Sequence, residues 1–184
     1  MAQPINRREA VKTSFLAGAA LAAPLYVPRR VFGANDTIIM GIIGSGGRGC
    51  DVMRKCIREN AKFVAVCDVS EPRIQDGIKS AEINNGGKID VYKDFNQLLE
   101  RKDIDAVLIG TPEHQHCRQM VAAVQAGKDV YCEKPMSHSI EEGAWAVREV
   151  RKTDRIVQIG MQRRSAPLIL EGLKVIQSGI LGDV

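Results

Sequence analysis

The chain has 184 residues, 45% of them hydrophobic, and a formal net charge of +4. Its first 33 residues also sum to +4, from one acid and five bases: Glu9 and Arg7, Arg8, Lys12, Arg29 and Arg30. The remaining chain is therefore neutral, without the basic cluster that a nucleic-acid-binding face needs, and we expect no nucleic-acid partner. Its length suits one domain with a hydrophobic core.

Residues 1–33 are expected to be an export signal and linker. The pair Arg7-Arg8 precedes an uncharged stretch over 14–23 that contains the small-residue cleavage pattern Ala20-Leu21-Ala22. The arginine pair indicates the twin-arginine route and a periplasmic location. An uncleaved N-terminal arm or membrane anchor is the alternative, although the apolar run is short for a bilayer span. We expect contact with a membrane only through this signal.

A strand, a glycine-rich turn, a helix and a second strand are expected between residues 38 and 68. The turn Gly44-Ser45-Gly46-Gly47-Arg48-Gly49 fits G-x-G-x-x-G, and Asp68 lies 19 residues beyond Gly49. In this layout the N–H groups at the start of the helix meet a pyrophosphate, and the acid accepts hydrogen bonds from a ribose. The alternatives are an ordinary turn or another nucleotide-like ligand.

The acid also bears on the choice of cofactor. A 2′-phosphate beside the Asp68 carboxylate would suffer a repulsion of about 4 kcal/mol per charge pair at 4 Å. NAD is therefore favoured. Arg73 could offset this repulsion, which keeps NADP as an alternative.

Further strands and helices alternate to the end of the chain. We expect strands near residues 91–92 and over 105–110, 129–132 and 156–160, and helices over 70–83, near 95–99, before Gly127, after Ser139 and over 167–178. This alternation predicts an α/β fold, a doubly wound parallel sheet of the Rossmann type. Ligands of such sheets bind at the carboxyl ends of the strands, where these segments lie: 44–49, Asp68, Thr111-Pro112, Glu133-Lys134-Pro135 and Gly160-Met161-Gln162.

Neither a metal site nor a disulfide framework is expected. The cysteines are odd in number and lack metal-like spacing. His114 and His116 are two residues apart, so on a helix they point to nearly opposite faces. No third ligand follows at a useful spacing.

Three of these segments resemble the Gfo/Idh/MocA oxidoreductases, the family of glucose–fructose oxidoreductase and inositol dehydrogenase. Thr111-Pro112-Glu113-His114-Gln115-His116 is similar to its T-P-x-x-x-H segment, and Glu133-Lys134-Pro135 matches its E-K-P segment. Residues 160–164 resemble the segment that leads from the sixth strand of these proteins into their second domain. Residues 31–36 resemble the junction found at the start of the domain in exported members. Glu113 and Ser165 depart from the commoner residues, which puts the substrate class in doubt.

The resemblance implies an oxidoreductase that uses NAD or NADP to oxidise or reduce a sugar or polyol hydroxyl. It also implies a C-terminal domain that supplies much of the substrate pocket. We therefore divide the chain into a signal and linker (1–33), a dinucleotide-binding Rossmann domain (34–162) and the beginning of a truncated substrate domain (163–184). The full-length protein is expected to be a homo-oligomer. An NAD-dependent glycosidase of the same superfamily and a non-catalytic dinucleotide-binding protein are the alternatives.

Two residues are predicted to be catalytic. Lys134 would take or share the hydroxyl proton, and the resemblance implies a cis peptide before Pro135. The alternative for Lys134 is a salt bridge to Glu133. His116 would contact the nicotinamide end or the substrate. The full set of expected cofactor-binding residues is Gly44, Ser45, Gly46, Gly47, Arg48, Gly49, Asp68, Thr111, Pro112, His116, Glu133, Lys134, Pro135 and Gln162.

Overall fold

The computed structural model describes residues 37–85 and 87–182, so the expected export signal lies outside the described residues. One sheet contains the six described strands: β1 (Ile38–Ile43), β2 (Ala61–Cys67), β3 (Asp90–Tyr92), β4 (Ala106–Ile109), β5 (Asp129–Glu133) and β6 (Val157–Gly160). All its strand pairs are parallel, in the order β3-β2-β1-β4-β5-β6. This is the predicted doubly wound Rossmann sheet.

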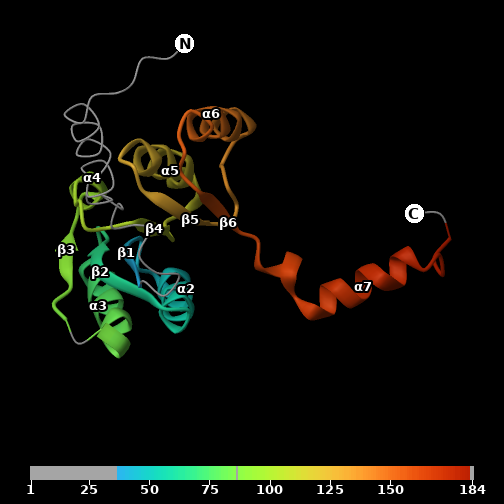
Figure 1. Cartoon of the computed structure of the whole chain (residues 1–184), viewed down its shortest axis with the longest axis horizontal. Coiled ribbons are helices and arrows are strands. Elements are labelled where there is room, and N and C mark those ends of the chain that lie inside the picture. The colour runs from blue at the N-terminus through green and yellow to red at the C-terminus, as the bar shows by residue number, and fades with distance from the viewer. Residues whose placement is uncertain (1–36, 86, 183–184) are drawn as a thin grey trace, which may run out of the picture. The chain divides into compact units, whose positions relative to one another are not determined.

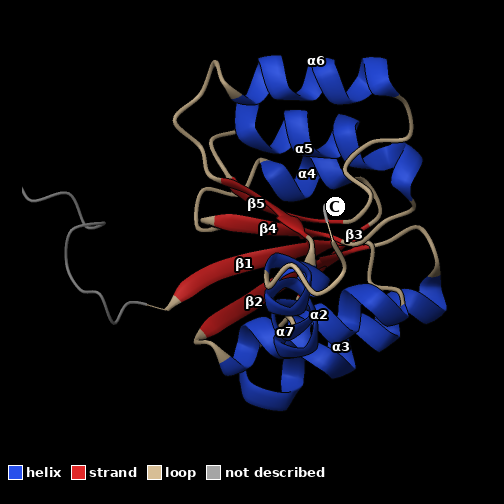
Figure 2. Cartoon of the chain, turned by 90° about the vertical axis from the view of Figure 1, so that its right-hand side faces the viewer, coloured by secondary structure: helices blue, strands red, loops and turns tan. Residues whose placement is uncertain are grey.

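Helices cover both faces of this sheet (Figures 1 and 2). The described α-helices are α2 (Gly47–Arg58), α3 (Glu71–Asn85), α4 (Phe95–Leu99), α5 (His116–Gln125), α6 (Ile140–Val150) and α7 (Pro167–Gln177), and the short 3-10 helices are η2 (Glu113–Gln115) and η3 (Gln162–Ser165). Helices α2 and α3 lie on one face, and α4, α5 and α6 lie on the other. The helices that follow β1 and β2 lie on one face, and those that follow β3, β4 and β5 lie on the other (Figure 2). The boundary between the two sets is at β1 and β4, which are neighbours in the middle of the sheet.

Alternating side chains of the strands divide the core into two layers. Met40 and Ile42 of β1 pack with Val52 and Met53 of α2, whereas Ile43 belongs to the layer beneath α4, α5 and α6. Burial of these apolar side chains on both faces explains the nearly continuous hydrophobic strands in the sequence.

Strand β2 contains one surplus residue. Met40 pairs with Phe63 and Gly41 pairs with Ala65, which leaves Val64 without a direct partner on β1. Val64 and Ala65 both face the α4–α5–α6 layer, so two successive side chains point the same way, as in a β-bulge. The alternation then resumes and continues to the end of the strand.

The residues after β6 differ from the sheet and its helices in exposure. Every described residue from 167 to 182, which includes α7, is exposed. The described chain from Thr37 onward forms one compact unit, so the predicted division at residue 163 stays a prediction. None of the described helices is both long and apolar enough for a membrane span.

Candidate functional site

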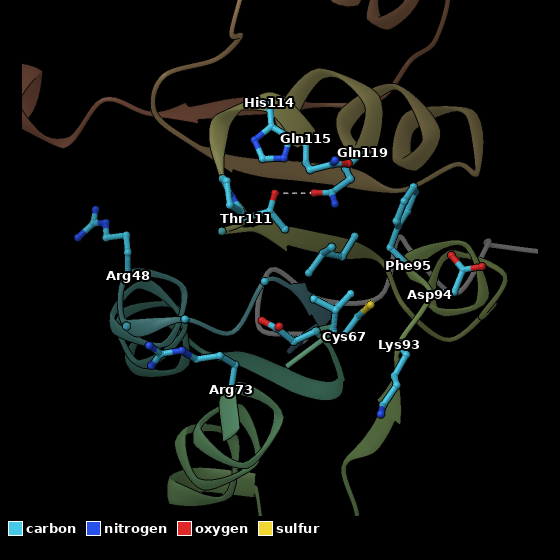
Figure 3. Close-up of a pocket in the computed structure, with 18 residues that line it drawn as sticks. Arg48, Cys67, Arg73, Lys93, Asp94, Phe95, Thr111, His114, Gln115 and Gln119 are labelled. Atoms are coloured by element: carbon cyan, nitrogen blue, oxygen red, sulfur yellow. Dashed lines mark hydrogen bonds between the residues drawn. The ribbon is translucent and has the colours of Figure 1, made fainter. Parts of the chain in front are cut away.

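A pocket of about 810 Å³ lies at the carboxyl ends of β1 and β4, between the segments that follow them (Figure 3). A volume of this size accommodates a small-molecule cofactor. The residues that line it are Ile43, Gly44, Gly46, Gly47, Arg48, Cys67, Asp68, Val69, Arg73, Lys93, Asp94, Phe95, Gly110, Thr111, Pro112, His114, Gln115 and Gln119. The pocket therefore lies at the topological switch point, where ligands of doubly wound sheets bind.

The glycine-rich turn forms one wall of the pocket. Gly44 has φ +87°, and a Cβ built there would lie 2.5 Å from the amide nitrogen of Thr111. Gly49 is just as restricted, because a Cβ at this position would overlap the carbonyl oxygen of Gly44. These two positions require glycine for different reasons: one for its backbone conformation, the other for the close approach of helix and turn.

The start of α2 is open toward the pocket. Gly46 is the N-cap residue, without a side-chain capping hydrogen bond, and the first turn carries no acid. A Cβ built at Gly46 or Gly47 would meet no atom within 4 Å. Backbone N–H groups at a helix start favour an anion, and the missing side chains let one approach the backbone.

Asp68 ties the end of β2 to the glycine-rich turn. Its Oδ2 accepts a hydrogen bond from the backbone N–H of Ser45 (2.9 Å), and its Oδ1 accepts one from the N–H of Ser70 (3.0 Å). Ser45 is itself fixed, because its hydroxyl donates to the carbonyl oxygen of Arg73 (2.8 Å). Each carboxylate oxygen has a second lone pair, so Asp68 can also accept hydrogen bonds from a ligand.

Glu133 is a buried carboxylate that joins three segments behind the pocket. Its Oε1 accepts from Nη2 of Arg48 (2.9 Å) and from Nε2 of Gln162 (2.6 Å), and its Oε2 accepts from the backbone N–H of Lys134 (3.3 Å). The hydrogen bond to Glu133 raises the pKa of the Arg48 guanidinium. Burial raises the pKa of the neighbouring Tyr131 hydroxyl. Glu133 and Gln162 thus brace the site from outside the pocket lining.

Lys134 and Pro135 lie beyond the pocket. The peptide bond between them is cis, as predicted. The Lys134 side chain is exposed, and among the described residues its ammonium group has no hydrogen-bond or ion-pair partner. Glu133 pairs with Arg48 instead, which rules out the simple Glu133–Lys134 salt bridge as the explanation for this lysine. Its catalytic role stays a prediction.

His116, a predicted catalytic and cofactor-binding residue, lies outside the pocket wall. Its side chain is only 1% exposed and does not line the pocket. Its Nδ1 lies 2.6 Å from the carbonyl oxygen of Pro135, and its Nε2 lies 2.8 Å from that of Thr111. A neutral imidazole donates to one of these oxygens, and a protonated ring donates to both. With both ring nitrogens directed at backbone oxygens, His116 connects the loop after β4 to the loop after β5, and its contact with a ligand stays a prediction.

Several residues of the pocket wall were absent from the predicted set. Lys93, Asp94 and Phe95 follow β3, and Gln115 and Gln119 lie on η2 and α5. The loop after β3 could have been found from the sequence, because the end of any strand in a doubly wound sheet is a candidate. Gln119 gives no such signal, since it lies in the middle of an otherwise ordinary amphipathic helix.

Cys67 also reaches the pocket wall, at the end of β2. Burial, together with the smaller effect of the nearby Asp68 and Asp94 carboxylates, raises its thiol pKa to about 12. This side chain therefore stays neutral at ordinary pH and adds apolar surface to the pocket rather than a nucleophile. All five cysteines of the chain are free thiols in the structure.

A comparison with known protein families shows which family this chain belongs to. The Gfo/Idh/MocA family model, described as an oxidoreductase family with an NAD-binding Rossmann fold, matches residues 38–161. The chain belongs to this family. The match begins at β1 and ends after β6, so it covers the glycine-rich turn and every strand of the sheet.

Several inositol dehydrogenases are among the similar proteins. Inositol 2-dehydrogenase from Klebsiella pneumoniae is 33% identical over 146 residues, which is 78% of this chain and 42% of that protein. Inositol 2-dehydrogenase 1 from Saccharopolyspora erythraea is 31% identical over 150 residues, covering 80% of this chain and 43% of that one. The chain therefore spans less than half the length of the curated relatives it matches.

A solved structure supports the same grouping. The scyllo-inositol dehydrogenase of Lactobacillus casei, with bound NAD(H) and scyllo-inositol, is 28% identical and has a TM-score of 0.68. The superposition covers 80% of this chain and 43% of that protein.

The residues of the pocket fit NAD. The open helix start at Gly46 and Gly47 would hold the diphosphate, and Asp68 would accept the hydroxyls of the adenosine ribose. Beyond Asp68, apolar surface from Val69, Phe95 and Cys67 suits a flat base. Of the predicted cofactor-binding residues, seven lie in the pocket wall: Gly44, Gly46, Gly47, Arg48, Asp68, Thr111 and Pro112.

Proposed function

We propose that the protein is an NAD-dependent oxidoreductase that transfers a hydride between the nicotinamide and a CH–OH group of a sugar or polyol. One observation carries the proposal: an open helix start and an acid share one pocket at the β1–β4 switch point. They do so in a chain that matches an NAD-binding oxidoreductase family over 38–161. The relatives named as inositol dehydrogenases favour a polyol or cyclic sugar as substrate.

We assign to Lys134 the role of taking or sharing the proton of the substrate hydroxyl. Bound NAD would supply the hydride acceptor, and the carbinol oxygen would then need a group to hold its proton. Lys134 is exposed, and its ammonium group has no partner among the described residues, so it is free to meet a substrate hydroxyl. It also lies one residue from Pro135, whose carbonyl His116 contacts, so the loop that carries it is fastened.

The charges of the pocket favour NAD over NADP. Asp68 would repel a 2′-phosphate on the ribose that it binds. Arg73 and Lys93 line the same pocket, but each is paired with an acid: Arg73 with Asp76 at 3.2 Å and Lys93 with Glu71 at 3.8 Å. These pairs are exposed and weak, so both cations can still turn toward a phosphate. We therefore expect NADP to bind, at lower affinity.

Two measurements on the purified protein test this function. Titration calorimetry with NAD should detect binding, and reduced nicotinamide should accumulate when NAD is mixed with a panel of inositols and hexoses. Absence of NAD binding would overturn the proposal. If NAD binds and glycosides are cleaved without net change in nicotinamide absorbance, the reaction is that of an NAD-dependent glycosidase. Binding without either reaction would favour a non-catalytic dinucleotide-binding protein.

Export by the twin-arginine route is a separate part of the proposal. It is supported by the arginine pair, the uncharged stretch after it and the Ala-Leu-Ala pattern at 20–22. The double variant Arg7→Lys, Arg8→Lys keeps the charge but removes the pair. We expect it to leave the protein in the cytoplasm of a bacterial host, whereas the unchanged protein reaches the periplasm. Equal periplasmic yields would contradict this route.

A further inference from the structure

Gln119 has an unusual position for a polar side chain. It lies within α5, is only 5% exposed and lines the pocket. Its Oε1 accepts a hydrogen bond of 2.7 Å from the hydroxyl of Thr111, the residue after the β4 end (Figure 3). Thr111 thus fixes the amide group by its oxygen side, and the amide nitrogen points the other way.

The amide nitrogen of Gln119 has no hydrogen-bond partner within the part of the chain that the structure describes. Every fully buried side-chain nitrogen or oxygen of the described residues has a partner, so this nitrogen is not sealed in the core. Figure 3 shows it directed into the pocket, on the side where Phe95 lies. A donor in such a place is costly when a ligand displaces water without replacing its hydrogen bond, and favourable when the ligand supplies an acceptor.

We propose that Gln119 is a cofactor-binding residue whose amide N–H donates to an acceptor nitrogen of the adenine ring. The inference rests on the proposed NAD binding and adds to it the residue that recognises the adenine base. If Asp68 holds the ribose, the base must lie farther from the glycine-rich turn. In that direction the pocket continues to Val69, Phe95 and Gln119. Apolar side chains suit the faces of a purine, and an amide N–H suits the acceptor nitrogens on its edge.

Thr111 has a defined part in this arrangement. An amide can present either its oxygen or its nitrogen to a ligand, and its hydrogen-bond partners decide which. The hydroxyl of Thr111 donates to the oxygen of Gln119, which leaves the N–H group for the ligand. Thr111 is thus a positioning residue for Gln119 in addition to being part of the pocket wall.

Calorimetry with matched variants tests the proposal. Gln119→Leu and Gln119→Met remove the donor at similar side-chain size, and Gln125→Leu makes the same change at an exposed position of the same helix. The Kd values for NAD, ADP-ribose and AMP should each rise about three- to tenfold in the Gln119 variants, as expected for one lost hydrogen bond. Ribose 5-phosphate lacks the base. In competition with NAD it should bind the unchanged protein and the Gln119 variants equally. Thr111→Val should give a smaller loss of the same kind.

These results distinguish a role of Gln119 in binding the base from a role in the packing of the protein. If the unchanged protein binds no NAD, the proposed function fails. If it binds NAD and the Gln119 variants bind it equally well, only the role of Gln119 fails, whatever happens to their thermal stability. An equal loss for ribose 5-phosphate would also overturn the inference, because the contact would then lie outside the base. Should Gln119→Leu not fold, Gln119→Met and Thr111→Val carry the same test.

Discussion

The two halves of the site differ in how completely the described residues build them. Around β1 and β4, the glycine-rich turn and Asp68 are held by backbone hydrogen bonds and enclose a pocket. Beyond β5 and β6, Lys134 and the whole of α7 are exposed. The comparison shows that the described residues build a pocket for the cofactor, whereas the lysine proposed for the chemistry is exposed at the end of β5. The family match over 38–161 includes both the pocket and Lys134, whereas α7 lies beyond it.

The largest effect is expected from Lys134→Ala, which separates the two halves cleanly. The side chain is exposed and makes no contact that stabilises the fold, so the free energy of unfolding should change by less than about 0.5 kcal/mol. NAD affinity should stay the same. Turnover should fall about 10²- to 10⁴-fold, the usual contribution of a positioned acid or base. Steady-state kinetics beside calorimetry would show this, and unchanged turnover would remove Lys134 from the mechanism.

Gly49→Ala should damage the cofactor half at its core. The added methyl group overlaps the carbonyl oxygen of Gly44 and cannot be relieved by a side-chain rotation. We expect a loss of about 2 to 3 kcal/mol in the free energy of unfolding, together with weaker NAD binding. Gly172→Ala is the control, because a Cβ there meets no atom within 4 Å and α7 is exposed. Denaturant titration should find this control equal to or more stable than the unchanged protein.

Asp68→Asn should alter selectivity within the same half. The amide oxygen can still accept from the N–H of Ser45, although the amide NH2 group cannot accept from that of Ser70, and the charge that repels a 2′-phosphate is gone. The ratio of NADP to NAD affinity should rise about tenfold or more, since one charge pair in a partly hydrated pocket is worth at least about 1.4 kcal/mol. Glu82→Gln removes the same charge from an exposed position of α3 and should leave the ratio unchanged. Calorimetry with both cofactors measures it.

The smallest effect is expected from Glu133→Gln, which weakens the link between the halves. Glu133 is buried, but Arg48 is 42% exposed and can be rehydrated when it loses its partner. The free energy of unfolding should fall by about 1 to 2 kcal/mol. Asp51→Asn removes the other, exposed partner of Arg48 and should cost less than about 0.5 kcal/mol. Equal losses in the two variants would show that Glu133 does not brace the site.

Much of the fold and part of the site could be predicted from local sequence. Buried parallel strands show as unbroken apolar runs, and the turn at 44–49 has a pattern that its backbone geometry requires. Family resemblance added the segment at 133–135 and the cis peptide before Pro135.

The remaining features depend on contacts that local patterns do not encode. Glu133 and Arg48 are 85 residues apart in the chain, and they pair only because the fold brings the start of α2 within reach of the end of β5. His116 was predicted to face a ligand, but the helix that it begins turns the ring toward two backbone carbonyls. Gln119 was missed for the same reason, because an amide in a buried helix has no sequence signature until its neighbours are known.

The surplus residue in β2 has an evolutionary consequence for chain length. Phe63 and Ala65 already face opposite layers, as neighbours in a regular strand would, so loss of Val64 would leave the pleat in phase on both sides. A homologue one residue shorter here could keep the acid that we propose binds the ribose directed at the pocket. An insertion between Val66 and Asp68 would instead reverse the direction of that acid. Loss of the residue at position 64 should therefore be tolerated, whereas an insertion after Val66 should be selected against.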